Sequence, residues 1–466
     1  MKNVALHNLG CKVNSYELDV VQQMLQENGY NIVSFDEKAD IYIVNTCTVT
    51  NMADRKSRQM LHRAKALNPD SVVIAIGCYV QTGKEDVVLD ESIDLAIGNN
   101  RKKDIVTIIE SYLQEKGLLQ DREKVDKTLN DTTIIDVNNT YEYEEMTLKK
   151  TAEHTRAYIK IQDGCNQFCT YCIIPYARGR VRSRRWEDIR LEIEGLVAAG
   201  YKEIVLTGIH ISSYGIDFEE EAWKTGESKE ALKSEGRHDY SGASKLIDLV
   251  ERIHEIPGLE RIRIGSLEPR IVTKEFAGRL ASLKRICPHF HLSLQSGCDA
   301  TLKRMNRHYT AAEYRESVEN LREAFERPAI TTDVIVGFPQ ETEEEFAETK
   351  AFLEQIGFFE MHIFKYSKRK GTIAAGMTGQ VSDSVKTDRS NELLRLEREQ
   401  SKEFRRFHLG KEVSVLFEET KQIQGKNYQL GHTMDYVKVA VETKEDLVNQ
   451  IRNVRVNSFL TDDILI

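Results

Sequence analysis

The sequence lacks any apolar run long enough to cross a membrane, and its first residues lack the character of a secretory signal. A membrane helix requires about 20 consecutive apolar residues, and no such run occurs in the 466 residues. Residues 1–7 turn polar too early for a signal peptide. Hydrophobic residues make up 40% of the chain and charged residues 30%. We therefore expect a soluble, cytoplasmic protein with no membrane partner.

Cysteine is scarce and positive charge is not in excess. Eight cysteines are too few for a disulfide scaffold in a chain of this length. The chain has 65 Lys and Arg against 74 Asp and Glu, a net charge of −9. Any binding to nucleic acid must therefore depend on local basic patches. The length predicts about two to four domains rather than one core.

Short apolar runs alternate with helical patterns over the first 110 or so residues. Val4–Leu6, Ile41–Val44 and Val72–Ile76 are typical of buried parallel strands. They are spaced as βαβ units require, roughly 30 or more residues apart. The pattern predicts a small open α/β sheet of flavodoxin or Rossmann type.

One cysteine follows each of these predicted strands: Cys11, Cys47 and Cys78. Because the carboxyl ends of parallel strands meet at one edge of a sheet, we expect the three thiols to converge. This placement favours an iron–sulfur cluster. A redox-active group of thiols is the competing interpretation.

Three more cysteines, Cys165, Cys169 and Cys172, lie in one short loop. Their spacing lets all three sulfurs face one centre. A four-iron cluster with three protein thiolates keeps one iron open for another ligand. The alternatives are a zinc site lacking its fourth ligand and three inert thiols. Cys287 and Cys298 have no partners at such spacing and are expected to be inert.

Six strand-like runs separated by amphipathic helices follow a polar stretch at about 120–150. The runs cover residues 158–161, 203–206, 261–264, 289–294, 331–336 and 361–366. Repeated βα units predict a parallel sheet, and six are fewer than the eight that close a barrel. We expect an open (β/α)6 partial TIM barrel with the cysteine loop at its carboxyl end. His210, His289 and His291 are interpreted as core histidines.

The loop of Cys165, Cys169 and Cys172, with Tyr171 before its last cysteine, resembles the CxxxCxxC loop of radical S-adenosylmethionine enzymes. Residues 161–179 resemble the methylthiotransferases of that superfamily. Residues 9–14 (LGCKVN) and 45–50 (NTCTVT) look most like the branch that acts on threonylcarbamoyladenosine in tRNA.

The resemblance implies two [4Fe-4S] clusters and S-adenosyl-L-methionine as cofactors. Cys165, Cys169 and Cys172 would hold the radical cluster, and Cys11, Cys47 and Cys78 an auxiliary one. Cleavage of the cofactor would supply a 5′-deoxyadenosyl radical. The implied activity is insertion of a methylthio group at C2 of N6-threonylcarbamoyladenosine at tRNA position 37.

The resemblance also implies residues near the cofactor. Tyr171 would lie against its adenine and Gly208 near its methionyl amine, while Ser266 and Glu268 match positions near its ribose and carboxylate. Residues such as Gly208, Ser266 and Glu268 also occur as ordinary turn formers and helix caps. The implied partners are the anticodon loop of tRNA, an external electron donor and a sulfur source.

Two regions are candidates for contact with RNA. Five arginines lie within eight residues that contain no acid: Arg178, Arg180, Arg182, Arg184 and Arg185. They predict phosphate contacts, with a solvated approach to a helix as the alternative. Beyond a helix at 382–408, short β-rich runs predict a small antiparallel β-barrel that resembles the TRAM domain. Lys438 is its candidate RNA contact, and a packing domain is the alternative.

The expected domains are 1–118 with the auxiliary cluster, a linker at 119–150, the radical core at 151–380, a connecting helix at 381–407 and a TRAM-like domain at 408–466. Residues 216–243 look like a charged insertion. Other functions compatible with the sequence are methylthiotransfer to isopentenyladenosine in tRNA or to a ribosomal-protein aspartate, and a non-catalytic iron–sulfur or zinc RNA-binding protein.

Overall fold

The computed structural model describes residues 2–118, 133–150, 155–218 and 241–466. Residues 119–132 of the predicted linker and residues 219–240 of the charged insertion lie outside these ranges. The chain forms two compact units. Unit 1 combines residues 1–152, 158–196 and 367–375, and unit 2 combines residues 153–157, 197–366 and 376–466.

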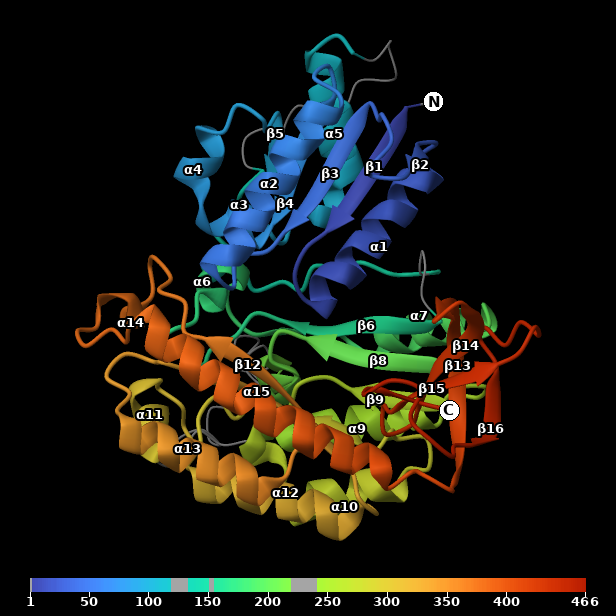
Figure 1. Ribbon diagram of the computed structural model, residues 1–466. Helices are drawn as coiled ribbons and strands as arrows, with labels where there is room; N and C mark the ends of the chain where they lie inside the picture. Colours follow the sequence, from blue (N-terminus) through green and yellow to red (C-terminus); the bar gives the residue numbers. More distant parts are fainter. Residues whose placement is uncertain (1, 119–132, 151–154, 219–240) are drawn as a thin grey trace, which may run out of the picture. The chain divides into compact units, whose positions relative to one another are not determined.

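Unit 1 contains a five-stranded parallel sheet in the order β2-β1-β3-β4-β5 (Figure 1). Its strands are β1 (Asn3–Asn8), β2 (Asn31–Val33), β3 (Ile41–Thr46), β4 (Val72–Gly77) and β5 (Leu95–Ile97). This is the flavodoxin order, in which the chain reverses direction across the sheet between β1 and β3. The three predicted strands are confirmed, and β2 and β5 are additional.

Helices cover both faces of this sheet. They are α1 (Lys12–Glu27), α2 (Asn51–Leu67), α3 (Cys78–Thr82), α4 (Lys84–Val88) and α5 (Ile105–Glu115). Leu61 and Ala64 of α2 pack against alternate residues of β3 and β4 such as Tyr42 and Ala75. The intervening residues of these strands are buried as well. Helices α1 and α5 contact each other.

The cysteine loop at 165–172 also belongs to unit 1. It follows β6 (Arg156–Asp163) and precedes α6 (Ile174–Arg178) and α7 (Trp186–Ala198). Two residues of β6, Gln162 and Asp163, pair with the short strand β7 (Arg182–Ser183) in antiparallel fashion. The loop is therefore held between two paired strands.

Unit 2 contains the other five predicted central strands, all parallel. They are β8 (Glu203–Gly208), β9 (Arg261–Ile264), β10 (His289–His291), β11 (Ala329–Val336) and β12 (Glu360–Lys365). β8 pairs with β9, and β10, β11 and β12 pair in sequence order. Single bridges such as Leu267 to Leu292 join β9 to the β10 segment. Together with β6, these strands confirm the six βα units expected from the sequence.

The helices of unit 2 lie together on one side of its parallel strands (Figure 1). They are α9 (Ser241–His254), α10 (Lys274–Ser282), α11 (Asp299–Arg304), α12 (Ala311–Ala324), α13 (Glu343–Ile356) and α15 (Asp383–Arg406). The short helix α14 (Ile373–Gly376) spans a boundary between the two units. None of the helices in the described residues is long and apolar enough to span a bilayer.

The carboxyl-terminal sheet has the order β16-β13-β14-β15-β17. Its strands are β13 (Glu412–Ile423), β14 (Lys426–Thr433), β15 (Lys438–Glu442), β16 (Ile451–Arg455) and β17 (Ile464–Leu465). All pairs are antiparallel except β15 with β17. This confirms the mixed α/β fold with a small antiparallel domain at its end.

Two arginines of β9, at its first and third positions, connect this sheet to the parallel strands. Arg261 donates to the carbonyl oxygen of Ser414 at 2.9 Å, and Arg263 donates to that of Met434 at 3.0 Å. The carboxyl-terminal sheet therefore covers the amino ends of the parallel strands, which leaves the opposite end for ligands.

Candidate active site

The three amino-terminal cysteines follow the carboxyl ends of β1, β3 and β4, as the sequence predicts. Cys11 precedes the first turn of α1, Cys47 follows β3 directly, and Cys78 begins α3. β1 and β3 are the strands between which the chain reverses direction, which is where open α/β sheets bind ligands.

The three thiols lie close enough to interact. The pKa of the Cys47 thiol is raised to about 11, chiefly by burial and to a lesser extent by the neighbouring Cys78 and Cys11 thiols. A Cβ atom at Gly10, beside Cys11, would lie only 3.1 Å from the Cys47 sulfur. Because this raised pKa keeps the Cys47 thiol protonated at neutral pH, a bound cation is needed to convert it to a thiolate.

Asn14 ties the Cys11 and Cys47 loops together. Its side-chain nitrogen donates to the carbonyl oxygen of Leu9 at 2.7 Å and to that of Thr46 at 3.0 Å. In return, Asn45 donates to the carbonyl oxygen of Asn14 at 2.8 Å. These hydrogen bonds fix the spacing between the two cysteines.

The backbone geometry of the second cysteine loop requires glycine at position 164. Gly164 has φ of +73°, and a Cβ atom there would lie 1.8 Å from the carbonyl oxygen of Arg180. This close approach allows Cys165 to donate its backbone N–H to the carbonyl oxygen of Gly179 at 3.0 Å. The loop closes further through a hydrogen bond from Cys172 N–H to Cys169 O at 2.9 Å.

The segment 367–375 contacts both cysteine groups within unit 1. Arg369 forms an ion pair with Asp54 and hydrogen bonds to Thr48, the residue after Cys47. Farther along, Ala374 N–H donates to the carbonyl oxygen of Thr170 in the second loop at 2.8 Å. One short segment thus supports both groups.

Arg178 connects the two groups more directly. Its side chain is 1% exposed, and its Nε donates to the Cys78 sulfur at 3.3 Å. Asn99 donates to the same sulfur at 3.5 Å. The Arg178 guanidinium also pairs with Glu17 of α1 and with Asp163 at the end of β6.

A buried cluster of charges surrounds Arg178. The side chains that pair with Glu17 or Asp163 are Lys102, Lys160, Arg178 and Arg182. Burial alone would raise the pKa of Glu17, but Arg178, Lys102 and Lys160 hold it well below its ordinary value. Burial raises the pKa of the nearby Glu144, which favours its neutral form. These four cations against two carboxylates leave a surplus of positive charge beside the Cys78 sulfur.

The burial of three predicted RNA-contacting arginines corrects the sequence interpretation. Arg178 and Arg182 are 1% exposed and Arg184 is fully buried. Arg184 pairs with Glu192 and, at 3.1 Å, with Glu145. Side chains held by internal carboxylates in this way do not reach the phosphates of a bound RNA.

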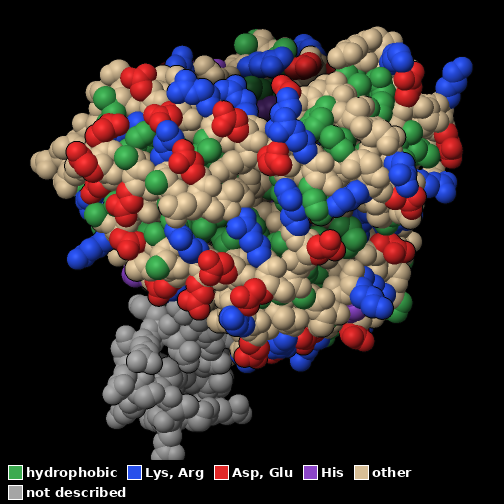
Figure 2. Space-filling view, turned by 60° about the horizontal axis from the view of Figure 1, so that its bottom comes forward, with side chains coloured by type: hydrophobic (Ala, Val, Ile, Leu, Met, Phe, Trp, Pro, Cys, Tyr) green, Lys and Arg blue, Asp and Glu red, His purple; other side chains and the backbone are tan. Residues whose placement is uncertain are grey.

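Arg180 and Arg185 are exposed, and the Arg180 guanidinium lies 4.5 Å from the centre of the Phe168 ring. Lys438 on β15 is half-buried. Over the described residues of the face shown in Figure 2, acidic and basic side chains are intermixed. A phosphate-binding surface therefore has to be local, as the net charge predicts.

The predicted cofactor residues belong to both units. Tyr171 lies in the second cysteine loop of unit 1. In unit 2, Gly208 ends β8, while Ser266, which is exposed, and Glu268, which is buried, follow β9. Cys287 and Cys298 are buried, at 0% and 2% exposure.

Glu268 is a buried carboxylate with a shifted pKa. Burial raises its pKa to about 7, with Arg307 opposing the shift. One carboxylate oxygen accepts a hydrogen bond from Arg270 Nε at 2.8 Å, and the other, Oε2, is buried without a hydrogen-bond partner in the described part of the chain. A buried acceptor of this kind suits a cationic ligand group.

Comparisons with known families cover most of the chain. Residues 159–353 match the Radical SAM superfamily. Residues 3–98 match a family described as Uncharacterized protein family UPF0004.

Curated relatives are similar over nearly the whole length. Threonylcarbamoyladenosine tRNA methylthiotransferase MtaB of Bacillus subtilis is 39% identical, over 98% of this chain and 94% of the relative. The protein of the same name from Aquifex aeolicus is 37% identical, over 91% of this chain and 95% of the relative. A tRNA-2-methylthio-N(6)-dimethylallyladenosine synthase of Thermoanaerobacter sp. is 32% identical, over 98% of this chain and 90% of the relative.

A solved structure supports the fold. The radical S-adenosylmethionine methyltransferase TsrM of Kitasatospora setae, with cobalamin and a [4Fe-4S] cluster bound, superposes with a TM-score of 0.52 at 16% identity. The superposition covers 78% of this chain and 75% of TsrM.

Proposed function

The chain belongs to the tRNA methylthiotransferases of the Radical SAM superfamily, and we propose that it inserts a methylthio group at C2 of N6-threonylcarbamoyladenosine at tRNA position 37. Its relatives that carry this activity in their names reach 39% identity, against 32% for those named for dimethylallyladenosine. The same difference disfavours the isopentenyladenosine alternative.

We propose two [4Fe-4S] clusters, each held by three cysteines. Cys11, Cys47 and Cys78 would bind the auxiliary cluster, and Cys165, Cys169 and Cys172 the radical cluster. The observation that carries this proposal is the meeting of the first three thiols at the carboxyl edge of the sheet, next to a surplus of buried positive charge. Such a site suits thiolates bound to an anionic cluster. When bound, the clusters supply electron transfer and an open iron for the cofactor.

S-Adenosylmethionine is the proposed cofactor, with Tyr171, Gly208, Ser266 and Glu268 as its contacts. Gly208 and Ser266 lie at strand ends, where backbone groups are accessible to a ligand. The Oε2 atom of Glu268 would accept a hydrogen bond from a cationic ligand group. These residues bind and orient, while the difficult chemistry belongs to the cofactor.

Each domain expected from the sequence has its own proposed role. Residues 1–118 would hold the auxiliary cluster, 151–380 would form the radical core, and 408–466 would contact RNA through Lys438. Arg180 and Arg185 are the remaining candidates for phosphate contacts near the second cysteine loop. The anticodon loop of tRNA, an external electron donor and a sulfur source are the proposed partners, and the cytoplasm is the proposed location.

The experiment that tests this function is anaerobic turnover with purified tRNA, followed by mass spectrometry of the nucleosides. Substrate tRNA is prepared from one strain lacking threonylcarbamoyladenosine and one lacking isopentenyladenosine. We expect the methylthio product only from tRNA that carries threonylcarbamoyladenosine. Product formed only on isopentenyladenosine would assign the chain to the other branch, and a ribosomal-protein substrate would give no modified nucleoside. Zinc without labile sulfide would favour the non-catalytic binder.

A further inference from the structure

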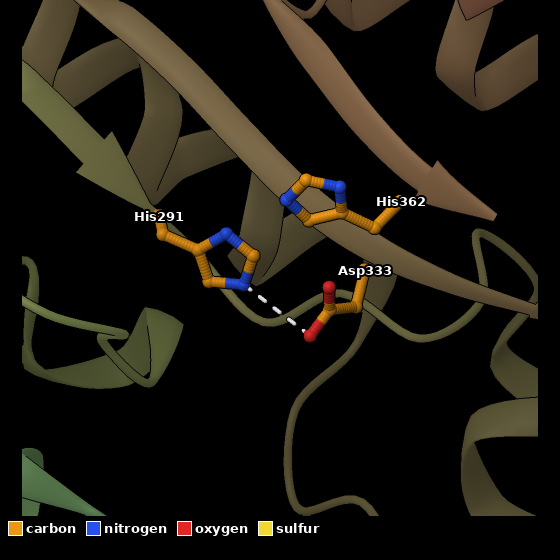
Figure 3. A group of neighbouring side chains, drawn as sticks. All are labelled: His291, Asp333 and His362. Atoms are coloured by element: carbon orange, nitrogen blue, oxygen red, sulfur yellow. Dashed lines mark ion pairs between the residues drawn. The ribbon is translucent and has the colours of Figure 1, made fainter. Parts of the chain in front are cut away.

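Three side chains with metal-binding chemistry meet on neighbouring strands of unit 2 (Figure 3). They are His291 at the end of β10, Asp333 in β11 and His362 in β12. In the strand register, Asp333 lies opposite His362, and His291 lies opposite Thr331. Because side chains alternate along a strand, residues 331 and 333 lie on the same face. Three adjacent strands therefore present the three side chains together.

The face on which they lie is the one turned away from the helices. Phe290 precedes His291 and packs its ring against Phe325, at the end of α12, with ring centres 5.0 Å apart. His291 consequently points to the opposite face of β10. The side chains of His291 and Asp333 remain 15% and 31% exposed. The group is rigidly supported and still open to a ligand from solution.

The potential ligand atoms of the three residues all lie within 4.8 Å of one another. His291 Nε2 is 3.4 Å from Asp333 Oδ2. The two imidazole rings are inclined by only 23°, with centres 5.9 Å apart. Two imidazoles and one carboxylate are the ligand set of many three-residue metal sites, which leave further positions open.

A second hydrogen bond orients His291. Its Nδ1 lies 3.1 Å from Thr331 Oγ1, so Nε2 is the nitrogen that faces Asp333. Metal-binding histidines are commonly held in this way, with one ring nitrogen on an oxygen of the protein and the other on the ion. A simple ion pair with Asp333 would use one histidine, whereas here the ring of His362 also lies next to the carboxylate (Figure 3).

We propose that His291, Asp333 and His362 form a binding site for a divalent first-row metal ion. The single carboxylate leaves a net positive charge on the occupied site, and the open positions take water or an oxygen ligand. The site is separate from the six cysteines proposed for the clusters. The proposed metal site does not depend on the proposed tRNA reaction.

The test is a titration of the anaerobically prepared holoenzyme with Mn²⁺, followed by the electron paramagnetic resonance signal of free Mn²⁺. Manganese is chosen because carboxylate and imidazole suit it better than thiolate does, so the cysteines compete weakly. Both clusters are kept in their oxidised, diamagnetic state. We expect about one tight Mn²⁺ per chain, which corresponds to one three-ligand site.

Variants identify the ligands. His291→Gln and Asp333→Asn should abolish the tight site, with the iron and sulfide content of the protein unchanged. Thr331→Val, which removes only the orienting hydroxyl, should weaken Mn²⁺ binding by about 10- to 100-fold. The matched control is His62→Gln, because His62 forms a pair with Asp90 at 3.1 Å but is in no group of three such ligands in the described residues. This variant should bind Mn²⁺ as the unaltered protein does.

Absence of a tight Mn²⁺ site in the unaltered protein would overturn the proposal. So would a tight site that survives both His291→Gln and Asp333→Asn. A Thr331→Val variant that folds, keeps its iron and binds Mn²⁺ with full affinity would remove the proposed role of the hydroxyl.

Discussion

The Nε of Arg178 donates a hydrogen bond to the sulfur of Cys78 at 3.3 Å. Arg178 lies six residues after the last cysteine of the second loop, whereas Cys78 begins a helix of the amino-terminal sheet. A side chain from one proposed cluster segment thus contacts a proposed ligand of the other cluster. Hydrogen bonds to cluster sulfurs are among the factors that set cluster potentials.

Replacing Arg178 with lysine should lower the reduction potential of the auxiliary cluster. Lysine keeps the positive charge near Glu17 but cannot reproduce the planar donor geometry of arginine, so the Cys78 sulfur loses a hydrogen bond. An anaerobic redox titration monitored by electron paramagnetic resonance measures the shift. Arg180→Lys, at an exposed position nearby, is the control and should leave both potentials unchanged. Equal shifts of both clusters in Arg178→Lys would contradict the assignment.

Glu17→Gln should destabilise the protein strongly. The substitution leaves Lys102, Lys160 and Arg178 without their common carboxylate, and breaking a buried ion pair in this way costs about 3–5 kcal/mol. Chemical denaturation followed by circular dichroism measures the change. Glu27→Gln is the matched control on the same helix, because Glu27 pairs with Lys149 at the surface at 2.7 Å and should cost at most about 1 kcal/mol. Similar losses in the two variants would refute the importance of the buried cluster.

The same carboxylate makes stability sensitive to acid. Neighbouring cations hold the folded-state pKa of Glu17 below its unfolded value, so its stabilising contribution is complete above a pH of about 4.3. The contribution is lost as the pH falls from there toward the folded-state pKa. The Glu17→Gln variant should therefore lose less stability than the unaltered protein between pH 5 and pH 3, measured by denaturation at each pH.

Gly164→Ala should prevent assembly of the radical cluster and spare the auxiliary one. The added methyl group would collide with the carbonyl oxygen of Arg180, and the positive φ disfavours alanine in any case. Iron and sulfide analysis should give about four irons per chain instead of about eight. Gly195→Ala is the control, since a Cβ atom there meets nothing within 4 Å in α7. Full iron content in Gly164→Ala would show that the loop tolerates the change.

The binding of S-adenosylmethionine should strengthen as the pH rises from 6 to 8. Burial raises the pKa of Glu268 to about 7, and the ionised carboxylate is the form that attracts a cationic ligand. The ionised fraction grows about tenfold over this range, and the apparent Kd should fall by the same factor. Equilibrium binding at several pH values measures it. Glu268→Gln should remove the pH dependence, whereas Glu275→Gln, at an exposed position, should preserve it.

Periodicity and strand spacing predict much of this fold. The three strands before Cys11, Cys47 and Cys78, and the six central strands, contain short apolar runs that recur at regular intervals between helical patterns. β2, β5 and β17 contain only two or three residues and lie outside these regularly spaced runs. Their places depend on neighbours that are distant in sequence.

The positions of the cysteines at the strand ends were predictable for the same reason, but the burial of the arginines was not. Arg178, Arg182 and Arg184 look like a basic surface because their partners Glu17, Asp163 and Glu192 come from other elements. The sequence of α1 does indicate a buried ion pair, because Glu17 occurs at helical spacing among the buried residues Val13, Val20 and Val21. An acid on an apolar helix face requires an internal cation.

The most direct test of the two-cluster account compares two triple variants with the unaltered protein, all prepared without oxygen. One replaces Cys11, Cys47 and Cys78 with alanine, and the other replaces Cys165, Cys169 and Cys172. Each variant should keep about four of about eight irons, and only the first should still release 5′-deoxyadenosine from S-adenosylmethionine under a strong reductant. Release by the second variant, or full iron content in either, would contradict the account.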